Sequence, residues 1–290
     1  MRGLGAGQAK TSDLGRSKAQ MYCKPSQTEA FMGTILSFVN QKGGVGKTTS
    51  AVNIAASLGV LGKKVLLVDI DPQGNATSGL GISKKSLEVS MIDVLIRPEG
   101  DPRRASAADA VIETEFQNLS VIPSTISLAA AEFEISELEN GENCLKNALA
   151  DIKDEYDYII IDCPPSLGLI TVNVLTASDG VIIPMQTEFY SLEGLSQLML
   201  TVKRVKSHYN PDLAVTGILV TMNNPRLLLS MQVMYELEHH YKDKLFKTCI
   251  SRNVKVSEAP GFGRPVYYHD KRSKGAQEYL EVARELIRRT

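Results

Sequence analysis

The chain alternates short apolar runs with longer segments whose apolar residues recur at helical spacing. Most of the short runs are nearly continuous in Val, Ile and Leu, which is typical of strands buried on both faces of a parallel sheet. We predict strands at residues 34–40, 64–70, 119–124, 156–163, 180–185, 214–222 and 245–250.

The segments between these runs are predicted to be helices, most clearly residues 48–62, 192–209 and 229–241. Strands that alternate with helices imply right-handed βαβ units. We therefore predict a single α/β domain over residues 32–290, with a twisted, mostly parallel sheet and helices on both faces. Residues 97–115 are expected to form a loop or small insertion within this domain. Residues 1–31 show no sustained periodicity and are predicted to be a flexible tail.

The composition fits a globular protein, with 43% hydrophobic and 22% charged residues. No apolar run approaches the roughly 18 residues of a membrane span, so we expect no membrane segment. The four cysteines form no CxxC pair, which makes a zinc site or a disulfide framework unexpected and favours a cytoplasmic protein; they are Cys23, Cys144, Cys163 and Cys249.

The net charge of −1 hides an uneven distribution along the chain. Residues 201–290 hold 16 Lys and Arg against 9 Asp and Glu. Clustered positive charge on a nearly neutral protein suggests a polyanionic partner for one face, although solvated surface lysines would give the same count.

A glycine-rich turn stands between the first predicted strand and the first predicted helix, in the stretch "NQKGGVGKTTS". This context makes a phosphate-binding loop credible, because glycines let backbone N–H groups approach phosphate oxygens at a helix N-terminus. We expect Lys47 to reach the β- and γ-phosphates and the Thr48 hydroxyl to bind Mg²⁺. The predicted phosphate contacts are Gly43, Gly44, Val45, Gly46, Lys47, Thr48 and Thr49.

Three acidic residues are expected at the carboxyl edge of the sheet, where open α/β sheets bind ligands. Asp69 and Asp71 end the second strand, and Asp162 follows the apolar run "YIII". Asp162 has the form of the Walker B aspartate that supports Mg²⁺. One of the other two carboxylates could support the metal while its neighbour orients an attacking water, although either could instead close a turn.

Lys42 is one lysine more than a phosphate-binding loop requires, and it precedes the glycine turn. Its side chain is expected to project outward, either as an ordinary exposed lysine or as a cation delivered to a second copy of the chain. In the second case two protomers face each other across two nucleotides, and Lys42 serves the partner's phosphates as an arginine finger does. Dimerisation and ATP binding would then be linked.

The stretches "KGGVGKTT", "DIDPQGNATSGLG" and "IIIDCPPSLG", followed by "TEFYSLEGLSQL" and "SRNVKVSEAPGFGRPV", resemble the ParA/Soj partition ATPases of the MinD-ParA superfamily. The resemblance covers about residues 32–290. It implies a Mg²⁺-dependent ATPase that forms an ATP-sandwich homodimer, binds double-stranded DNA without sequence preference and is reset by a ParB-type centromere-binding partner. It also implies partition of a chromosome or plasmid on the nucleoid of a bacterial cytoplasm.

The resemblance assigns residues as well as an activity. It makes Lys42 the signature lysine, Lys47 the P-loop lysine, Thr48 the Mg²⁺ ligand, Asp71 the water-orienting acid and Asp162 the Walker B acid. Asp69, the other acid of the pair, is then expected to support the metal. The resemblance places the adenine base near Met222, Arg252 and Asn253. It places DNA contacts at Arg226 and Lys255, and the basic excess of residues 201–290 adds Lys247, Arg264, Lys271 and Lys274 as expected DNA contacts.

The sequence departs from the family in two places near the base. "TMNNPRLLLS" lacks the usual acidic residue before the arginine, and Ser251 stands where proline is usual. Two other functions remain open. A membrane-recruited ATPase like MinD would need an amphipathic C-terminal anchor, and a metallocluster or metabolic relative would need suitably placed cysteines.

Overall fold

The computed structural model describes residues 5, 33–96 and 105–290. The chain divides into two units, Met1–Phe31 and Met32–Thr290, and the fold below is that of the second. The tail predicted for residues 1–31 lies outside the described residues, apart from Gly5. Residues 97–104 of the predicted loop also lie outside them.

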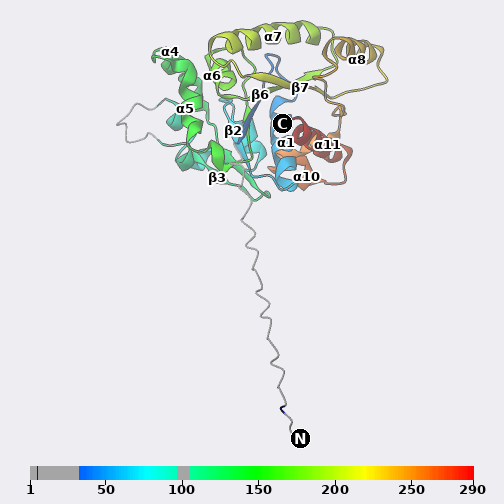
Figure 1. The fold of residues 1–290 in the computed structure, drawn as a ribbon. Helices are drawn as coiled ribbons and strands as arrows, with labels where there is room; N and C mark the ends of the chain where they lie inside the picture. Colours follow the sequence, from blue (N-terminus) through cyan, green and yellow to red (C-terminus); the bar gives the residue numbers. More distant parts are fainter. Residues whose placement is uncertain (1–4, 6–32, 97–104) are drawn as a thin grey trace. The chain divides into compact units, whose positions relative to one another are not determined.

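A seven-stranded sheet forms the centre of the described part of this unit (Figure 1). Its order is β3-β4-β2-β5-β1-β6-β7, and every neighbouring pair is parallel except β3 and β4. The predicted mostly parallel α/β domain is thus confirmed. The strands are β1 (Thr34–Phe38), β2 (Val65–Asp69), β3 (Ile112–Glu113), β4 (Leu119–Ile122), β5 (Tyr158–Asp162), β6 (Gly180–Gln186) and β7 (Ala214–Thr221).

Helices cover both faces of the sheet (Figure 1). One group, α1, α10 and α11, packs together on one face, and α5, α6 and α7 pack on the other. The helices are α1 (Lys47–Val60), α2 (Asn75–Gly79), α3 (Met91–Leu95), α4 (Ala131–Ser136), α5 (Cys144–Ala150), α6 (Leu169–Ala177), α7 (Ser191–His208), α8 (Leu228–Tyr241), α9 (Val254–Glu258), α10 (Val266–His269) and α11 (Lys274–Arg289).

The continuous apolar strands are explained by two separate cores, one on each face of the sheet. Successive residues of a strand point to opposite faces. In β1, Ile35 joins the core beneath α5 to α8, whereas Leu36 joins the core shared with α1 and α11. In β5, Ile159 and Ile160 divide in the same way. A strand covered on both sides is therefore mostly apolar up to its carboxyl end, although β1 buries Ser37.

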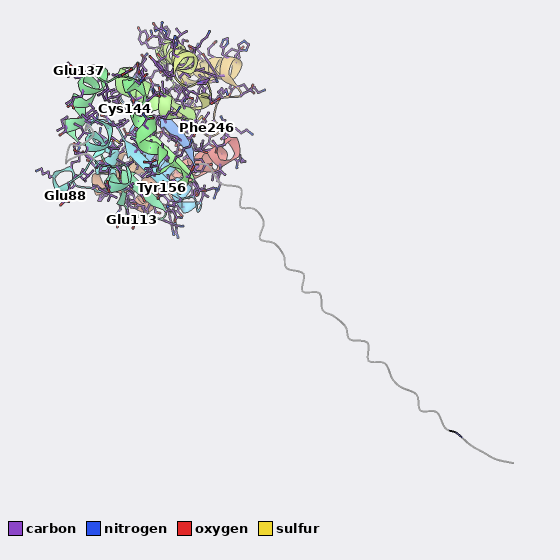
Figure 2. All side chains as sticks on the ribbon, turned by 60° about the vertical axis from the view of Figure 1, so that its left-hand side comes forward. Glu88, Glu113, Glu137, Cys144, Tyr156 and Phe246 are labelled. Carbon is purple, nitrogen blue, oxygen red and sulfur yellow. The ribbon has the colours of Figure 1, made fainter. Side chains whose placement is uncertain are left out.

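Six of the seven predicted strands are confirmed, and the prediction for residues 245–250 is wrong. That segment runs beside β7 and makes isolated backbone bonds to it instead of a ladder; Phe246 N–H donates to Ile218 O at 3.0 Å. The ring of Phe246 (Figure 2) fills the space beside Gly217, where an added Cβ would lie 2.4 Å from it. Conversely, β3 forms inside the predicted loop 97–115, as a two-residue antiparallel edge.

Candidate functional site

The glycine turn between β1 and α1 has the backbone of a phosphate-binding loop. Gly44 and Gly46 have φ of 74° and 85°, in the left-handed region that favours glycine. Gly46 stands at the N-cap of α1 and supplies no side-chain cap, so the first N–H groups of this 14-residue helix stay free for a ligand. Thr221 Oγ1 fixes the loop by donating to Val45 O at 2.7 Å. The turn can therefore bind an anion.

Lys47 lies across this loop, where its Nζ donates to the carbonyl oxygen of Lys42 at 3.1 Å. The residue is only 7% exposed. Burial lowers the pKa of Lys47, while the nearby carboxylates of Asp162 and Asp71 oppose that shift. A buried ammonium whose hydrogen-bond partner is a neutral carbonyl gains from an anionic partner. An anion bound over the loop would supply that partner.

Asp162 ends β5 beside the first turn of α1 and is fully buried. Neither of its carboxylate oxygens has a partner of hydrogen-bond geometry among the described residues. Burial and then the neighbouring Asp69 raise the pKa of Asp162 well above its usual value, whereas the nearby Thr48 hydroxyl and Lys47 lower it. An orphaned buried carboxylate next to a hydroxyl fits Mg²⁺, which takes one or two carboxylates together with phosphate and water oxygens. The residues present thus fit the metal that the motif implies.

Asp69 and Asp71 do not share one role. Asp69, the last residue of β2, accepts from Thr77 N at 2.8 Å, from Thr77 Oγ1 at 2.7 Å and from Asp71 N at 3.2 Å. Burial raises the pKa of Asp69 to about 6, although the bonds from Thr77 and Asp71 oppose the shift. Asp71 lies past the strand end, where its Oδ1 accepts from Gln73 N at 2.9 Å. Asp69 therefore fixes the turn that carries Asp71.

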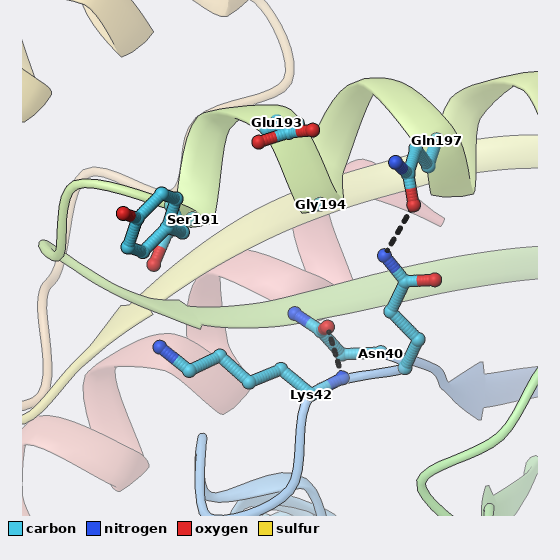
Figure 3. Close-up of a pocket in the computed structure, with 8 residues that line it drawn as sticks. Asn40, Lys42, Ser191, Glu193, Gly194 and Gln197 are labelled. Atoms are coloured by element: carbon cyan, nitrogen blue, oxygen red, sulfur yellow. Dashed lines mark hydrogen bonds between the residues drawn. The ribbon is translucent and has the colours of Figure 1, made fainter.

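Lys42 projects outward from the loop, as predicted from its position before the glycines. Its Nζ forms an ion pair with Glu188, in which the two side chains are 41% and 50% exposed. Asn40 Oδ1 accepts from Lys42 N at 3.0 Å, and Gln41 Nε2 donates to Gln197 Oε1 at 3.0 Å. The first bond shapes the start of the loop, and the second ties it to α7 beside a cavity of about 230 Å³ (Figure 3).

The three residues expected near the base line a single cavity of about 610 Å³. Met222, Arg252 and Asn253 are all on its wall. The cavity adjoins the phosphate loop, because Gln186 Nε2 lies 2.7 Å from Gly44 O and 3.5 Å from Met222 Sδ. Met222 has φ of 49°, which is unusual for a residue with a side chain and turns the chain sharply after β7. A ligand held by the loop can thus extend into this cavity.

The basic residues expected to contact DNA differ in their surroundings. Arg226 and Lys274 line the cavity just described, whereas Lys247 lines a different one of about 680 Å³. Three of the cations pair with carboxylates of the same chain: Lys255 with Glu258 at 2.9 Å, Arg264 with Glu115 at 3.7 Å and Lys274 with Glu278 at 3.5 Å. Lys271 precedes α11, and its carbonyl oxygen accepts from Gln277 Nε2 at 2.6 Å.

The sequence did not indicate Glu188, Thr77 or Thr221 as parts of the site. Glu188 and Thr221 each act on a motif residue from a distant part of the chain; Glu188 lies 146 positions from Lys42. Thr221 lies 176 positions from Val45. Only Thr77, eight positions from Asp69 and inside the same quoted motif, carried a local signal that could have identified it.

Two features of the fold bear on the alternative functions. Within the part of the chain that the structure describes, no helix has both the length and the apolar character needed to cross a bilayer. The same residues contain no group of three or more His, Cys, Asp or Glu side chains arranged to hold a metal ion by themselves. A Mg²⁺ site of the kind above does not require such a group, because phosphate and water supply most of its ligands.

Comparisons with known proteins agree with this geometry. Residues 33–215 match the AAA domain family. The chain is 53% identical over 255 residues to the sporulation initiation inhibitor protein Soj of Bacillus subtilis, across 88% of this chain and 98% of that protein. It is 45% identical over 271 residues to the chromosome partitioning protein ParA of Myxococcus xanthus, across 93% and 94% of the two chains. Cobyrinic acid a,c-diamide synthase from Mycobacterium smegmatis, solved with bound ADP and magnesium, superposes with a TM-score of 0.76 at 36% identity, across 89% and 95%.

Proposed function

The chain belongs to the ParA/Soj family of partitioning ATPases, and from this premise we propose that ATP switches it between a monomer and a DNA-binding dimer. Two copies close face to face over two molecules of ATP, each with Mg²⁺. The dimer binds double-stranded DNA without sequence preference on the nucleoid. Hydrolysis, stimulated by a ParB-type centromere-binding partner, returns the chain to the monomer and so moves a chromosome or plasmid.

The proposal assigns each side chain of the site a task. The loop N–H groups and Lys47 bind the phosphates and orient the terminal phosphoryl group. Thr48 and Asp162 would hold Mg²⁺, which supplies charge neutralisation at the β- and γ-phosphate oxygens when bound. Asp71 orients the attacking water, and Asp69 holds the turn that positions Asp71 through its bonds from Thr77. Lys42 of each protomer neutralises charge at the nucleotide of the other.

One observation supports this assignment above the rest: Asp162 is a fully buried carboxylate without a hydrogen-bond partner among the described residues, close to both Lys47 and the Thr48 hydroxyl. An uncompensated polar group of this kind costs free energy that a bound cation recovers. A glycine turn of no function would not place a buried acid, a buried ammonium and a hydroxyl together.

DNA is the proposed polyanion for the basic C-terminal third. The excess of 16 Lys and Arg over 9 Asp and Glu in residues 201–290 supports contact with phosphates. Contacts of this type are independent of sequence and weaken steeply with salt. A dimer would double the number of cations on the bound face.

The C-terminal helix argues against recruitment to a membrane. α11 is amphipathic, but the apolar residues that a membrane anchor would expose are buried against the domain; they include Tyr279, Val282, Ala283 and Leu286. Free insertion would require this helix to leave α1, which it covers. The family assignment and this packing both favour a role in partitioning DNA over recruitment to a membrane.

The decisive experiment measures DNA binding and oligomeric state with ATP, with ADP and without nucleotide. We expect Asp71→Ala to persist as an ATP-bound dimer on DNA, because hydrolysis is blocked. Lys42→Ala should bind ATP but hydrolyse it on the order of 10³-fold more slowly, the usual cost of losing a cation delivered in trans. Equal DNA affinity in all three nucleotide states would refute the switch, and full activity of a monomeric Lys42→Ala would refute the role in trans.

A further inference from the structure

A lysine outside the motifs, Lys84, lies over the turn that carries Asp71. It is the first residue of a short 3₁₀-helix, η1 (Lys84–Ser86), and its Nζ donates to Gln73 O at 2.7 Å. The turn ends at Gly74, which is the N-cap of α2 and has φ of 59°. A Cβ added to Gly74 would lie 2.7 Å from Lys84 Cδ, so the lysine stem covers the glycine. Lys84 therefore contacts the turn with both its apolar stem and its ammonium group.

The backbone bonds of this turn show what the ammonium group adds. Asp71 Oδ1 accepts from Gln73 N at 2.9 Å, and the Asp71 carbonyl oxygen accepts from Gly74 N at 2.8 Å. The Gly74 carbonyl accepts from Ser78 N at 3.1 Å, in the first turn of α2. The Gln73 carbonyl is bound by Lys84. Because the N–H of Gln73 holds the Asp71 carboxylate, a bond that fixes Gln73 also fixes the direction of that carboxylate.

The chain after α2 folds back and so brings Lys84 to the turn. Gly81 has φ of 79°, and the next residue, Ile82, donates from its N–H to Thr77 O at 3.2 Å. Thr77 is the same residue whose N–H and hydroxyl bind Asp69. Asp69 thus fixes the start of the turn, and Lys84 fixes its end.

We propose that Lys84 is a positioning residue for ATP hydrolysis, which holds the Asp71 carboxylate in the direction needed to orient the attacking water. The inference rests on the proposed function, in which Asp71 has that task. A reacting group misplaced by about 1 Å can cost on the order of 10²-fold in rate. Binding of ATP should change little, because Lys84 contacts the Asp71 turn and not the phosphate loop.

The test measures kcat and KM for ATP hydrolysis by the full chain, with Mg²⁺ and double-stranded DNA. Lys84→Met removes the ammonium group but keeps an apolar stem over Gly74. Its kcat should fall by about tenfold or more, with KM within about twofold of wild type. Lys84→Arg keeps a donor and should restore most of kcat. Lys85→Met is the matched control, because Lys85 is the next residue of η1 and is also exposed; its kcat should equal that of wild type.

A second measurement determines whether Lys84 acts through Asp71. In an Asp71→Ala background, Lys84→Met should lower the residual hydrolysis no further, because the group that it positions is absent. An equal fall in both backgrounds overturns the inference, and so does a folded Lys84→Met with the kcat of wild type. An Asp71→Ala variant as fast as wild type would instead overturn the task proposed for Asp71. Lys84→Gln, with the same expected loss, replaces Lys84→Met if melting curves show that the methionine variant is unfolded.

Discussion

Replacing Glu188 by Gln should strengthen ATP-dependent dimerisation of the chain. In the described structure Lys42 forms an ion pair with Glu188 of its own protomer. If Lys42 serves the nucleotide of a second copy, it must leave Glu188 when the two copies close. The ion pair therefore stabilises the monomer against the dimer, and each dimer requires two such pairs to be broken.

The size of the effect follows from how exposed the pair is. Its side chains are 41% and 50% exposed, and ion pairs in such surroundings contribute only about 0.2–1 kcal/mol. Two pairs per dimer make about 0.4–2 kcal/mol. The dimer dissociation constant should then fall by roughly 2- to 30-fold in Glu188→Gln. Salt screens exposed charges, so the gain should shrink as ionic strength rises.

Sedimentation velocity in ATP, with Asp71→Ala in every protein to prevent turnover, measures this constant. Glu193→Gln is the matched control, because Glu193 lines the same cavity beside Lys42 (Figure 3) but Lys42 pairs with Glu188. Removing Lys42 should abolish the effect of Glu188→Gln, which a double-mutant cycle tests. The reasoning is refuted if both glutamate variants shift the constant equally, or if Glu188→Gln acts the same in a Lys42→Ala background.

Two further predictions concern stability. Burial raises the pKa of Asp69 from 3.8 to about 6. The stability that the fold gains from keeping this carboxyl protonated is therefore complete below about pH 4 and is lost as the pH rises through about 6. The unfolding free energy of the wild type should fall by up to about 3 kcal/mol over that pH window. Urea titrations at each pH should find a smaller fall in Asp69→Asn, and an equal fall would contradict the raised pKa of Asp69. Ser50 and Tyr279 share a buried hydroxyl contact of 3.3 Å between α1 and α11. Tyr279→Phe should lower the unfolding free energy by about 1 kcal/mol. The double variant with Ser50→Ala should lose less than the sum of the two single losses in urea titrations, and simple additivity would show that the hydroxyls act independently.

The fold was predictable because its strongest signals are local. A strand covered on both faces is largely apolar, and β1, β2, β5 and β6 all show that pattern, although β1 also buries Ser37. The segment 245–250 is also mostly apolar, apart from Lys247 and Thr248, yet it does not form a strand. It bonds to β7 at isolated positions, as from Phe246 N–H to Ile218 O, and no periodicity within the segment encodes a neighbour so distant in the sequence.

The site was predictable to the same extent. The loop from Gly43 to Thr49 is contiguous in sequence, and the sheet brings Asp162 to it because β5 pairs with β1 in parallel. Parallel strands end at one edge, so acids at strand ends converge without further information. Glu188 carries no such pattern. Its importance comes from its ion pair with Lys42, which is a property of the folded chain.

Charge illustrates the difference between composition and structure most directly. The count of cations in residues 201–290 suggested a polyanion partner, but Lys255, Arg264 and Lys274 each have a carboxylate within 4 Å. These partners do not exclude DNA, because exposed pairs contribute only about 0.2–1 kcal/mol and a phosphate can replace the carboxylate. They do lower the net gain from each contact, since every phosphate bond formed by these residues requires one pair to be broken. Affinity for DNA should therefore depend on assembling many cations at once, which is what a dimer provides.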